Sequence, residues 1–267
     1  MNTTVGVIGA GRMGQPIIGH LVRKGFATRV YDIDAGKRAM VEERGAQWAG
    51  DLATLAGASD VMLVCVGYDE DLRALFPQLA PAARPGAIVA VLSTVHPKTV
   101  QDLASAHAPR LAVIDATMCR GGRAADEGTL LCFVGGEAAT VARLRPVLGA
   151  FAGDIVATGA VGSAQVAKAA NNLILWACLV ADHEALALAR SYGLDVEQLR
   201  KALGISSAAN DALAKWGTQT MAWAEDDMAI VADMARDSGL RLPQAAVTRE
   251  ICRVLKPRRY QLDQYGR

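Results

Sequence analysis

The first part of the chain alternates short runs rich in β-branched residues with stretches long enough to form helices. Residues 15–25, for example, are long enough for a helix and lie between two such runs. The runs that predict strands are residues 5–9, 28–32, 60–66, 87–93, 111–116, 130–136 and 154–159. Alternation of this kind is typical of parallel strands that are connected through helices. The sequence therefore predicts an α/β fold, a doubly wound and mainly parallel sheet with helices on both faces.

The strand pattern ends near Gly162, and the remaining residues have helical patterns. The sequence predicts helices at residues 163–191, 195–203, 208–223, 225–238 and 243–255, and a solvated tail at 256–260. Ser163 follows two nearby glycines and is a suitable N-cap for the first of these helices. We therefore expect two domains, residues 1–161 and an all-helical C-terminal domain at 162–267 that starts with a long interdomain helix.

Composition narrows the class of partner. The 28 Lys and Arg residues balance 27 Asp and Glu residues and are spread along the chain, which argues against nucleic acid or an anionic membrane as a partner. Strand-like residues begin at Thr4, too early for a signal peptide, so we expect a cytoplasmic protein. The longest uncharged run is interrupted by Gly, Ser, Gln and Asn, and we expect it to fall short of a membrane span. The five scattered cysteines and four histidines have no metal-ligand spacing, so we expect reduced thiols and no metal.

A glycine motif at the end of the first predicted strand indicates a dinucleotide site. Gly9, Gly11 and Gly14 form GxGxxG between a strand and a helix, and Asp32 ends the second predicted strand. The glycines permit a tight turn, close approach of a pyrophosphate and packing of helix on strand, which is the arrangement of a Rossmann-like domain. A carboxylate at Asp32 accepts hydrogen bonds from a ribose diol and repels a 2′-phosphate, which favours NAD over NADP. An alternative role for Asp32 is that of a helix N-cap.

Five stretches in order along the chain resemble motifs of the β-hydroxyacid dehydrogenases, the family of 3-hydroxyisobutyrate dehydrogenase, which is related to 6-phosphogluconate dehydrogenase. They are GAGRMG at 9–14, STVHP at 93–97, DATMCRGGRAADEGTL at 115–130, VGSAQVAKAANN at 161–172 and, more weakly, DDMAIVADMARDSGLRLP at 226–243. The resemblance implies an NAD(P)-dependent dehydrogenase of a small 3-hydroxy acid. It also implies a helical domain for substrate binding and dimerisation, and a homodimer or homotetramer.

The resemblance assigns roles to individual residues of this sequence. Lys168 takes the place of the catalytic lysine and Asn172 that of the asparagine that positions it, and Thr94 takes a place that contacts both nicotinamide and substrate. Cys119, Arg120 and Gly121 fall where the family holds the substrate carboxylate. The cofactor-binding positions are Gly9, Gly11, Arg12, Met13, Gly14, Asp32, Val66 and Thr94.

The spacing of two of these residues agrees with the resemblance. Lys168 and Asn172 are one helical turn apart and share a face of the predicted helix. An amine in apolar surroundings gives up its proton more readily, as a general base requires. The alternative is a lysine that extends along an apolar helix to reach water.

The sequence departs from the family pattern at two places that concern the site. Cys119-Arg120 replaces Ser-Gly, which suggests that Arg120 binds an anionic group of the substrate; the alternative is a solvated loop arginine. If the backbone at Arg120 has positive φ, strain of about 1 kcal/mol is expected. Asp226-Asp227 replaces the family's Lys-Asp, which removes a cation near the cofactor.

These departures leave two other functions open. An imine reductase shares the architecture, although such enzymes usually place another residue at the position of Lys168. A catalytically silent dinucleotide-binding protein is the second alternative.

Overall fold

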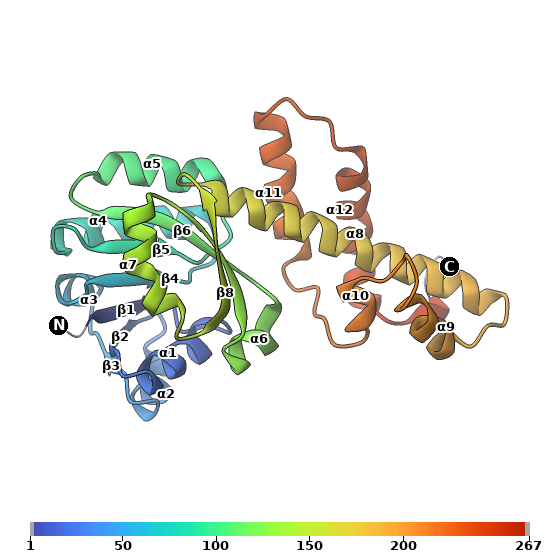
Figure 1. Cartoon of the computed structure of the whole chain (residues 1–267), viewed down its shortest axis with the longest axis horizontal. Helices are drawn as coiled ribbons and strands as arrows, with labels where there is room; N and C mark the ends of the chain where they lie inside the picture. Colours follow the sequence, from blue (N-terminus) through green and yellow to red (C-terminus); the bar gives the residue numbers. More distant parts are fainter. Residues whose placement is uncertain (1–2, 265–267) are drawn as a thin grey trace. The chain divides into compact units, whose positions relative to one another are not determined.

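The structure, a computed structural model, describes residues 3–264. The chain forms two compact units, one ending at Lys168 and the other beginning at Ala169 (Figure 1). Within the described residues the first unit contains one eight-stranded sheet with the order β3-β2-β1-β4-β5-β6-β7-β8. The strands are β1 (Thr4–Ile8), β2 (Ala27–Tyr31), β3 (Gln47–Trp48), β4 (Val61–Val64), β5 (Ile88–Val91), β6 (Ala112–Cys119), β7 (Leu130–Gly135) and β8 (Ala152–Gly159).

The sheet confirms the predicted α/β fold. All neighbouring strands are parallel except β6 and β7, which are antiparallel. Each of the seven predicted runs forms a strand, and β3 is an addition that the sequence analysis missed because it contains only two residues. The direction in which strands are added reverses between β1 and β4, where sheets of this type open a crevice for ligands at the carboxyl ends of the strands.

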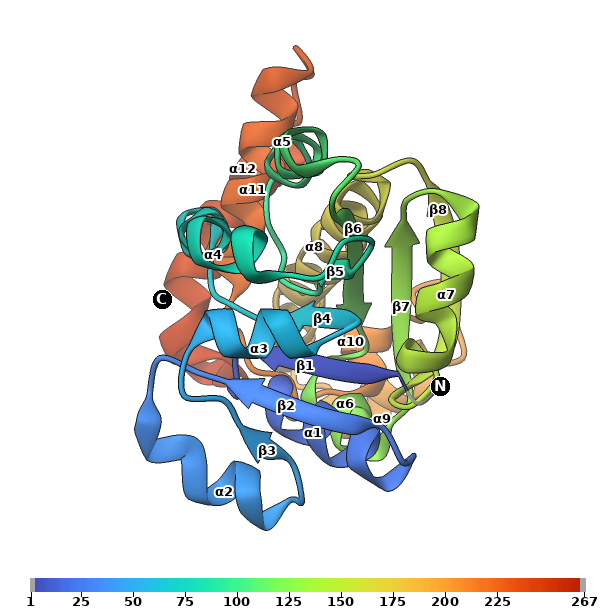
Figure 2. The same ribbon diagram turned by 90° about the vertical axis from the view of Figure 1, so that its left-hand side faces the viewer.

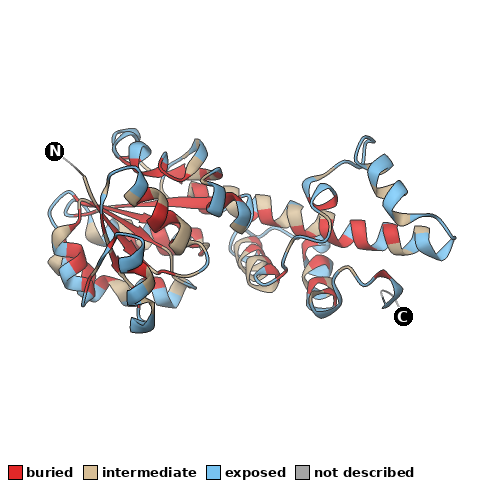
Figure 3. Cartoon of the chain, turned by 90° about the horizontal axis from the view of Figure 1, so that it is seen from below, coloured by how far each residue is buried: buried red, intermediate tan, exposed pale blue. Residues whose placement is uncertain are grey.

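Helices cover both faces of the sheet and bury it in two apolar layers (Figure 2). One face is covered by α1 (Gly14–Arg23), α2 (Arg38–Glu43), α6 (Gly121–Glu127) and α7 (Ala138–Leu148). The other face is covered by α3 (Leu52–Ala58), α4 (Asp69–Ala82) and α5 (Pro97–His107). Every residue of β4 and β5 is buried, and Figure 3 shows that much of the sheet is buried between its helices. Strands buried on both faces account for the continuous apolar runs in the sequence.

The second unit is helical. Its elements are the later part of α8 (Ser163–Ser191), then α9 (Val196–Leu203), α10 (Asp211–Ala214), α11 (Ala224–Asp237) and α12 (Pro243–Leu255). Trp176 and Leu179 of α8 pack with Met228 of α11 and Cys252 of α12 to form its core. The structure divides the chain within α8, after Lys168, so the first turns of this helix belong to the sheet unit.

One prediction for the second unit is wrong. The helix predicted at 208–223 forms only as α10, because the chain turns after Lys215 and Gly217 takes a left-handed conformation with φ of 84°. The tail predicted to be solvated, 256–260, is mostly exposed. It contains a short 3-10 turn at Lys256–Arg258, and at its end the hydroxyl of Tyr260 donates to the carbonyl of Gln219 at 3.0 Å.

The longest helix, α8, is more apolar over its length than the sequence analysis expected. Among the described residues α8 is the one helix long and apolar enough to cross a membrane, although the sequence analysis expected it to fall short. A core helix of a soluble protein meets the same criterion, and Trp176 and Leu179 place α8 in the core of the second unit.

Candidate active site

The glycine turn after β1 has the steric features of a phosphate cradle. A Cβ atom on Gly9 would overlap the carbonyl oxygen of Cys65, and one on Gly14 would overlap the carbonyl oxygen of Gly9. The close packing of the chain therefore requires glycine at both positions. A Cβ on Gly11 would meet no atom within 4 Å. Because packing within the chain does not account for this glycine, close approach of a ligand at the start of α1 is the remaining physical reason for it.

Asp32 is buried just beyond β2 and accepts three hydrogen bonds. Its Oδ2 accepts from the backbone N–H of Ala10 at 2.7 Å and from Nζ of Lys37 at 2.9 Å, and its Oδ1 accepts from the N–H of Asp34 at 2.9 Å. Burial would raise the pKa of Asp32, but these hydrogen bonds outweigh it and lower the pKa. The N-cap of the following 3-10 turn, Ala35–Lys37, is Asp34, so the alternative role that the sequence left open for Asp32 does not apply.

Arg12 connects the glycine turn to α6. Its two Nη atoms donate to the two carboxylate oxygens of Asp126 at 2.8 and 2.6 Å. The guanidinium lies so close to Gly122 that a Cβ there would come within 2.6 Å of it. The hydrogen bond from Arg12 holds the pKa of Asp126 below its usual value. Met13 beside it is partly buried against the core.

The loops after β4 and β5 are held together by Ser93. The N–H of Val66 donates to the Ser93 hydroxyl at 2.9 Å, and that hydroxyl donates to the carbonyl of Val66 at 2.8 Å. Thr94 follows directly and is partly buried. Val66 and Thr94, both predicted to contact the cofactor, thus lie in two loops that one side chain joins.

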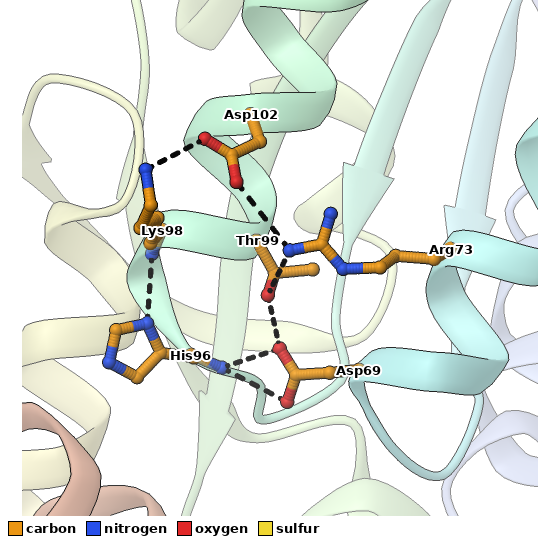
Figure 4. A network of polar contacts seen from close by, with 6 residues as sticks. All are labelled: Asp69, Arg73, His96, Lys98, Thr99 and Asp102. Carbon is orange, nitrogen blue, oxygen red and sulfur yellow. Dashed lines mark hydrogen bonds and ion pairs between the residues drawn. The ribbon is translucent and has the colours of Figure 1, made fainter.

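A second network fastens the helices that follow these loops (Figure 4). Its members are Asp69 and Arg73 of α4, with His96, Lys98, Thr99 and Asp102 at or near the start of α5. The carboxylate of Asp69 accepts from the N–H of His96 at 3.1 and 3.3 Å and from the hydroxyl of Thr99. Arg73 donates to the Thr99 hydroxyl at 3.1 Å and lies 3.6 Å from Asp102. The N-termini of α4 and α5 are therefore fixed relative to each other at this edge of the sheet.

Lys168 points toward the end of β6. Its Nζ donates to the carbonyl oxygen of Met118 at 2.7 Å, and the side chain is partly buried. The helix that carries it is held by Asp115 of β6, which is fully buried and accepts from the N–H groups of Gly162 at 2.8 Å and Gln165 at 2.9 Å. Burial raises the pKa of Asp115, and these backbone hydrogen bonds oppose the change.

In the loop after β6, Arg120 combines a left-handed backbone with two partners within the chain. The backbone of Arg120 is left-handed with φ of 83°, so the strain expected for a non-glycine residue at this position is present, and Gly121 follows with φ of 77°. The Nη2 of Arg120 lies 2.6 Å from Asp154 of β8, and its Nη1 donates to the carbonyl of Thr129 at 3.0 Å. The side chain is exposed, and its guanidinium has two partners within the chain. Cys119 is buried at the end of β6.

The remaining predicted positions lie in the second unit. Asn172 is buried on α8 and its Oδ1 accepts from the side chain of Asn171 at 3.0 Å. Asp226 and Asp227 occupy the first turn of α11, where acidic residues are favoured by the helix dipole. Asp227 also accepts from the indole of Trp176 at 3.0 Å. Asp226, the residue that departs from the family's Lys-Asp, thus lies where the helix dipole favours an acidic side chain, and Asp227 joins α11 to α8.

Two known family models match this sequence and together cover almost all of it. Residues 4–173 match the family model of the NAD binding domain of 6-phosphogluconate dehydrogenase, and residues 162–264 match that of the NAD-binding region of NADP-dependent 3-hydroxyisobutyrate dehydrogenase. The chain belongs to the β-hydroxyacid dehydrogenase family. It is an NAD(P)-dependent oxidoreductase of the 3-hydroxyisobutyrate dehydrogenase type.

Individual members of the family and its structural neighbours agree with this assignment. A probable 3-hydroxyisobutyrate dehydrogenase-like protein of Arabidopsis thaliana is 28% identical over 96% of this chain and 80% of its own length. The solved 3-hydroxyisobutyrate dehydrogenase of Mycobacterium tuberculosis with L-serine has 25% identity and a TM-score of 0.88, covering 96% of this chain and 94% of that one. An imine reductase from Myxococcus stipitatus in complex with NAD+ shares the fold with a TM-score of 0.71 at 20% identity, covering 99% of this chain and 97% of that one.

The sequence analysis missed several polar residues that hold the β-hydroxyacid dehydrogenase site together. They are Lys37, Asp69, Asp115, Asp126 and Gln165. Two of them carry a signal in the sequence. Asp115 is a charged residue inside an apolar strand pattern, and Gln165 is a polar residue in the first turn of an apolar helix. A polar side chain in a segment expected to be buried must find partners, and this is the signal by which both residues could have been found.

Proposed function

We propose that this β-hydroxyacid dehydrogenase interconverts a small 3-hydroxy acid and the corresponding aldehyde or keto acid, with NAD as cofactor and Lys168 as general acid and base. The observation that carries the proposal is the position of the Lys168 amine, 2.7 Å from the carbonyl oxygen of Met118 at the end of β6. This end of the strand lies at the edge of the sheet where the glycine turn also lies.

The residues around the glycine turn fit a dinucleotide. Gly9, Gly11 and Gly14 leave the start of α1 open to a pyrophosphate, and Asp32 supplies carboxylate oxygens to a ribose. Arg12, Met13, Val66 and Thr94 complete the set of residues that would hold NAD. When bound, NAD accepts a hydride from the carbinol carbon of the substrate.

Lys168 has the donor capacity that proton transfer requires. An ammonium has three N–H donors, and the carbonyl of Met118 uses one of them, so two remain for a substrate oxygen. As a neutral amine the group accepts the proton of the alcohol, and as an ammonium it returns that proton to the carbonyl oxygen in the reverse direction. Asn172, one turn further along α8, is the residue that we propose positions the substrate beside it.

A panel of small 3-hydroxy acids, including 3-hydroxyisobutyrate and L-serine, tests the proposed reaction by the absorbance of NADH, with NADP run in parallel. We expect turnover of at least one member with NAD. Lys168→Ala should lower kcat by a factor of about 10² to 10⁴, the usual contribution of a general acid or base, while NAD still binds. A variant that keeps the kcat of the unmodified protein would contradict the role of Lys168.

Two alternatives are distinguished when imines, with NADH and with NADPH, are added to this panel. An imine reductase is suggested by the shared fold, and it would reduce an imine while leaving every hydroxy acid unchanged. A silent dinucleotide-binding protein would bind NAD and turn over no member of either class. The presence of Lys168 at the motif position favours the dehydrogenase.

We further propose that two copies of the chain associate through α8. An exposed apolar stripe runs along this helix to the residue after its end, at spacings of 7, 4, 3 and 4 residues. It is formed by Ile174, Ala181, Ala185, Leu188 and Tyr192. Ile174 is 63% exposed, Leu188 62% and Tyr192 80%. Such spacing places apolar side chains on one side of a helix, and an exposed apolar face of this kind is a common protein interface.

A further inference from the structure

Gln165 lies on α8, less than one turn before Lys168, and is almost completely buried at 1% exposure. Its side-chain amide makes two hydrogen bonds to the loop after β5. The Nε2 donates to the carbonyl oxygen of Ser93 at 2.9 Å, and the Oε1 accepts from the N–H of Val95 at 3.0 Å. These two backbone groups flank Thr94 on either side, so a single amide spans the backbone of Thr94.

The backbone of Gln165 is fixed as well as its side chain. Its N–H donates to Asp115, which also holds the N–H of Gly162. On the preceding residue, the carbonyl of Ala164 accepts from the hydroxyl of Thr117 at 2.9 Å. The start of α8 is therefore anchored to β6 and cannot slide along its own axis without breaking buried hydrogen bonds.

We infer that Gln165 is a positioning residue that sets the distance between Thr94 and the amine of Lys168. The inference rests on the proposed function, in which Lys168 exchanges the proton and the Thr94 loop contacts cofactor and substrate. Lys168 follows three residues later on the same side of the helix, and its Nζ is fixed to Met118. The side chain of Gln165 therefore holds the Thr94 loop, while its backbone belongs to the same helical turn as Lys168.

Loss of the Gln165 hydrogen bonds should lower kcat more than it weakens the binding of NAD. A displacement of about 1 Å between reacting groups costs on the order of 100-fold in rate. Gln165→Leu removes both hydrogen bonds at similar volume. We expect it to lower kcat by about 100-fold and to leave the Kd for NAD within about 3-fold, because no contact with the glycine turn changes.

Gln165→Glu supplies a second measurement that also serves if the leucine variant does not fold. In this variant a protonated carboxyl group can donate to the Ser93 carbonyl and accept from the Val95 N–H, whereas the carboxylate can only accept. We therefore expect the kcat of Gln165→Glu, relative to the unmodified protein, to rise as pH falls. The matched control is Gln101→Leu. The amide of Gln101 donates to the carbonyl of Val161 at 3.1 Å, in the loop before α8, and does not contact the Thr94 loop. This control should change kcat by less than about 3-fold.

The outcomes separate the two proposals. If the unmodified protein turns over none of the 3-hydroxy acids, the proposed function fails and this inference fails with it. If it turns over a substrate and folded Gln165→Leu has unchanged kcat, this inference alone is overturned. A pH profile of Gln165→Glu that runs parallel to that of the unmodified protein would overturn it as well. An equal loss of kcat in Gln101→Leu would show a general structural effect and also overturn it.

Discussion

Several charged residues of the site are paired with a neighbour to which the motifs assign no role. Asp32 pairs with Lys37, Arg12 with Asp126, and Arg120 with Asp154. In each pair the first residue was predicted from its place in a motif, and the second comes from another position of the chain. At each of these positions the charge of the predicted residue is therefore partly neutralised by a residue of opposite charge.

The Asp32–Lys37 pair bears on the choice of cofactor. With Lys37 at 2.9 Å, the negative charge that would repel a 2′-phosphate is partly neutralised. We expect Lys37→Gln to raise the ratio of kcat/KM for NAD to that for NADP by about 5- to 10-fold, on the basis of about 1 kcal/mol between two unit charges in solvent-screened contact. Steady-state kinetics with both cofactors measures this ratio. Lys24→Gln, at an exposed position after α1, is the control, and equal ratios in the two variants would contradict the role of Lys37.

Arg120 gives a prediction about stability and substrate binding. Its left-handed backbone costs about 1 kcal/mol, and its exposed pair with Asp154 contributes about 0 to 1 kcal/mol. In Arg120→Gly these effects oppose each other, so we expect the free energy of unfolding to stay within about 1 kcal/mol. Because the guanidinium already has two partners, KM should also change by less than about 3-fold.

Denaturant unfolding and steady-state kinetics of Arg120→Gly check both statements. Asp154→Ala is the comparison, since it removes the pair and keeps the strain, and it should be the less stable of the two. A tenfold rise in KM for an acidic substrate in Arg120→Gly would restore the anion-binding role expected from the sequence.

At the level of single residues, the sequence identified positions better than it identified contacts. Lys168 and the three glycines occupy the places that the motifs imply. The partners of Arg120 could not be predicted, because Asp154 reaches it through the pairing of β7 with β8 and not through proximity in the chain. Contacts of this kind depend on strand order, which the spacing of motifs does not contain.

Among the elements, the strands were predicted more reliably than the helices of the second unit. Strands buried on both faces produce apolar runs that are hard to mistake. The predicted helix at 208–223 failed because the pattern of apolar residues continued through Gly217, whereas the backbone did not. The basic tail at 256–260 was predicted to be solvated, and Pro257, Arg258 and Arg259 are exposed, while Tyr260 attaches its end to the second unit.

One contact of the tail depends on the protonation state of His183 in α8. The Nδ1 of this fully buried histidine is 2.7 Å from the carbonyl of Leu179, so it carries a proton, and the Nε2 accepts from the N–H of Tyr260 at 2.9 Å. The ring is therefore neutral. Burial lowers the pKa of His183 from its ordinary value of 6.5, and the bond to Leu179 opposes the change.

This shift predicts that acid destabilises the second unit. In the range below about pH 6.5 and above the lowered pKa, the unfolded chain binds a proton at His183 and the folded chain does not, so stability falls as pH falls. We expect the midpoint of urea unfolding to lie at a lower urea concentration at pH 5.5 than at pH 7.5. In His183→Gln, which cannot titrate, the difference between the two pH values should be smaller. An equal difference in both proteins would contradict the role of His183.

The whole molecule depends on one helix that takes part in both units. The start of α8 is bound to β6 through Asp115 and Thr117, and its later residues Trp176 and Leu179 lie in the second core. The sequence analysis placed the boundary before this helix, at 161, because the glycines there end the strand pattern. The structure divides the chain after Lys168, since a buried carboxylate holds the first turn on the sheet.

The exposed stripe on α8 leads to a prediction about assembly. If the α8 stripe of one chain pairs with that of a second copy, light scattering should give a molar mass of about twice the 28.0 kDa of one chain, or a higher multiple. Leu188→Glu places a charge in the middle of the stripe at a position that is already 62% exposed, so the fold of the single chain should be kept. We expect this variant to shift to 28.0 kDa with an unchanged circular dichroism spectrum.

Val254→Glu on α12 is the matched control for this experiment. Val254 is 64% exposed and apolar, but it lies outside the α8 stripe, so the same substitution there should leave the assembly intact. If only Val254→Glu dissociates the protein, association occurs through α12, and the proposed role of α8 is wrong. Because a charge in an apolar interface must be desolvated without a partner, the correct interface is the one at which the glutamate produces monomers.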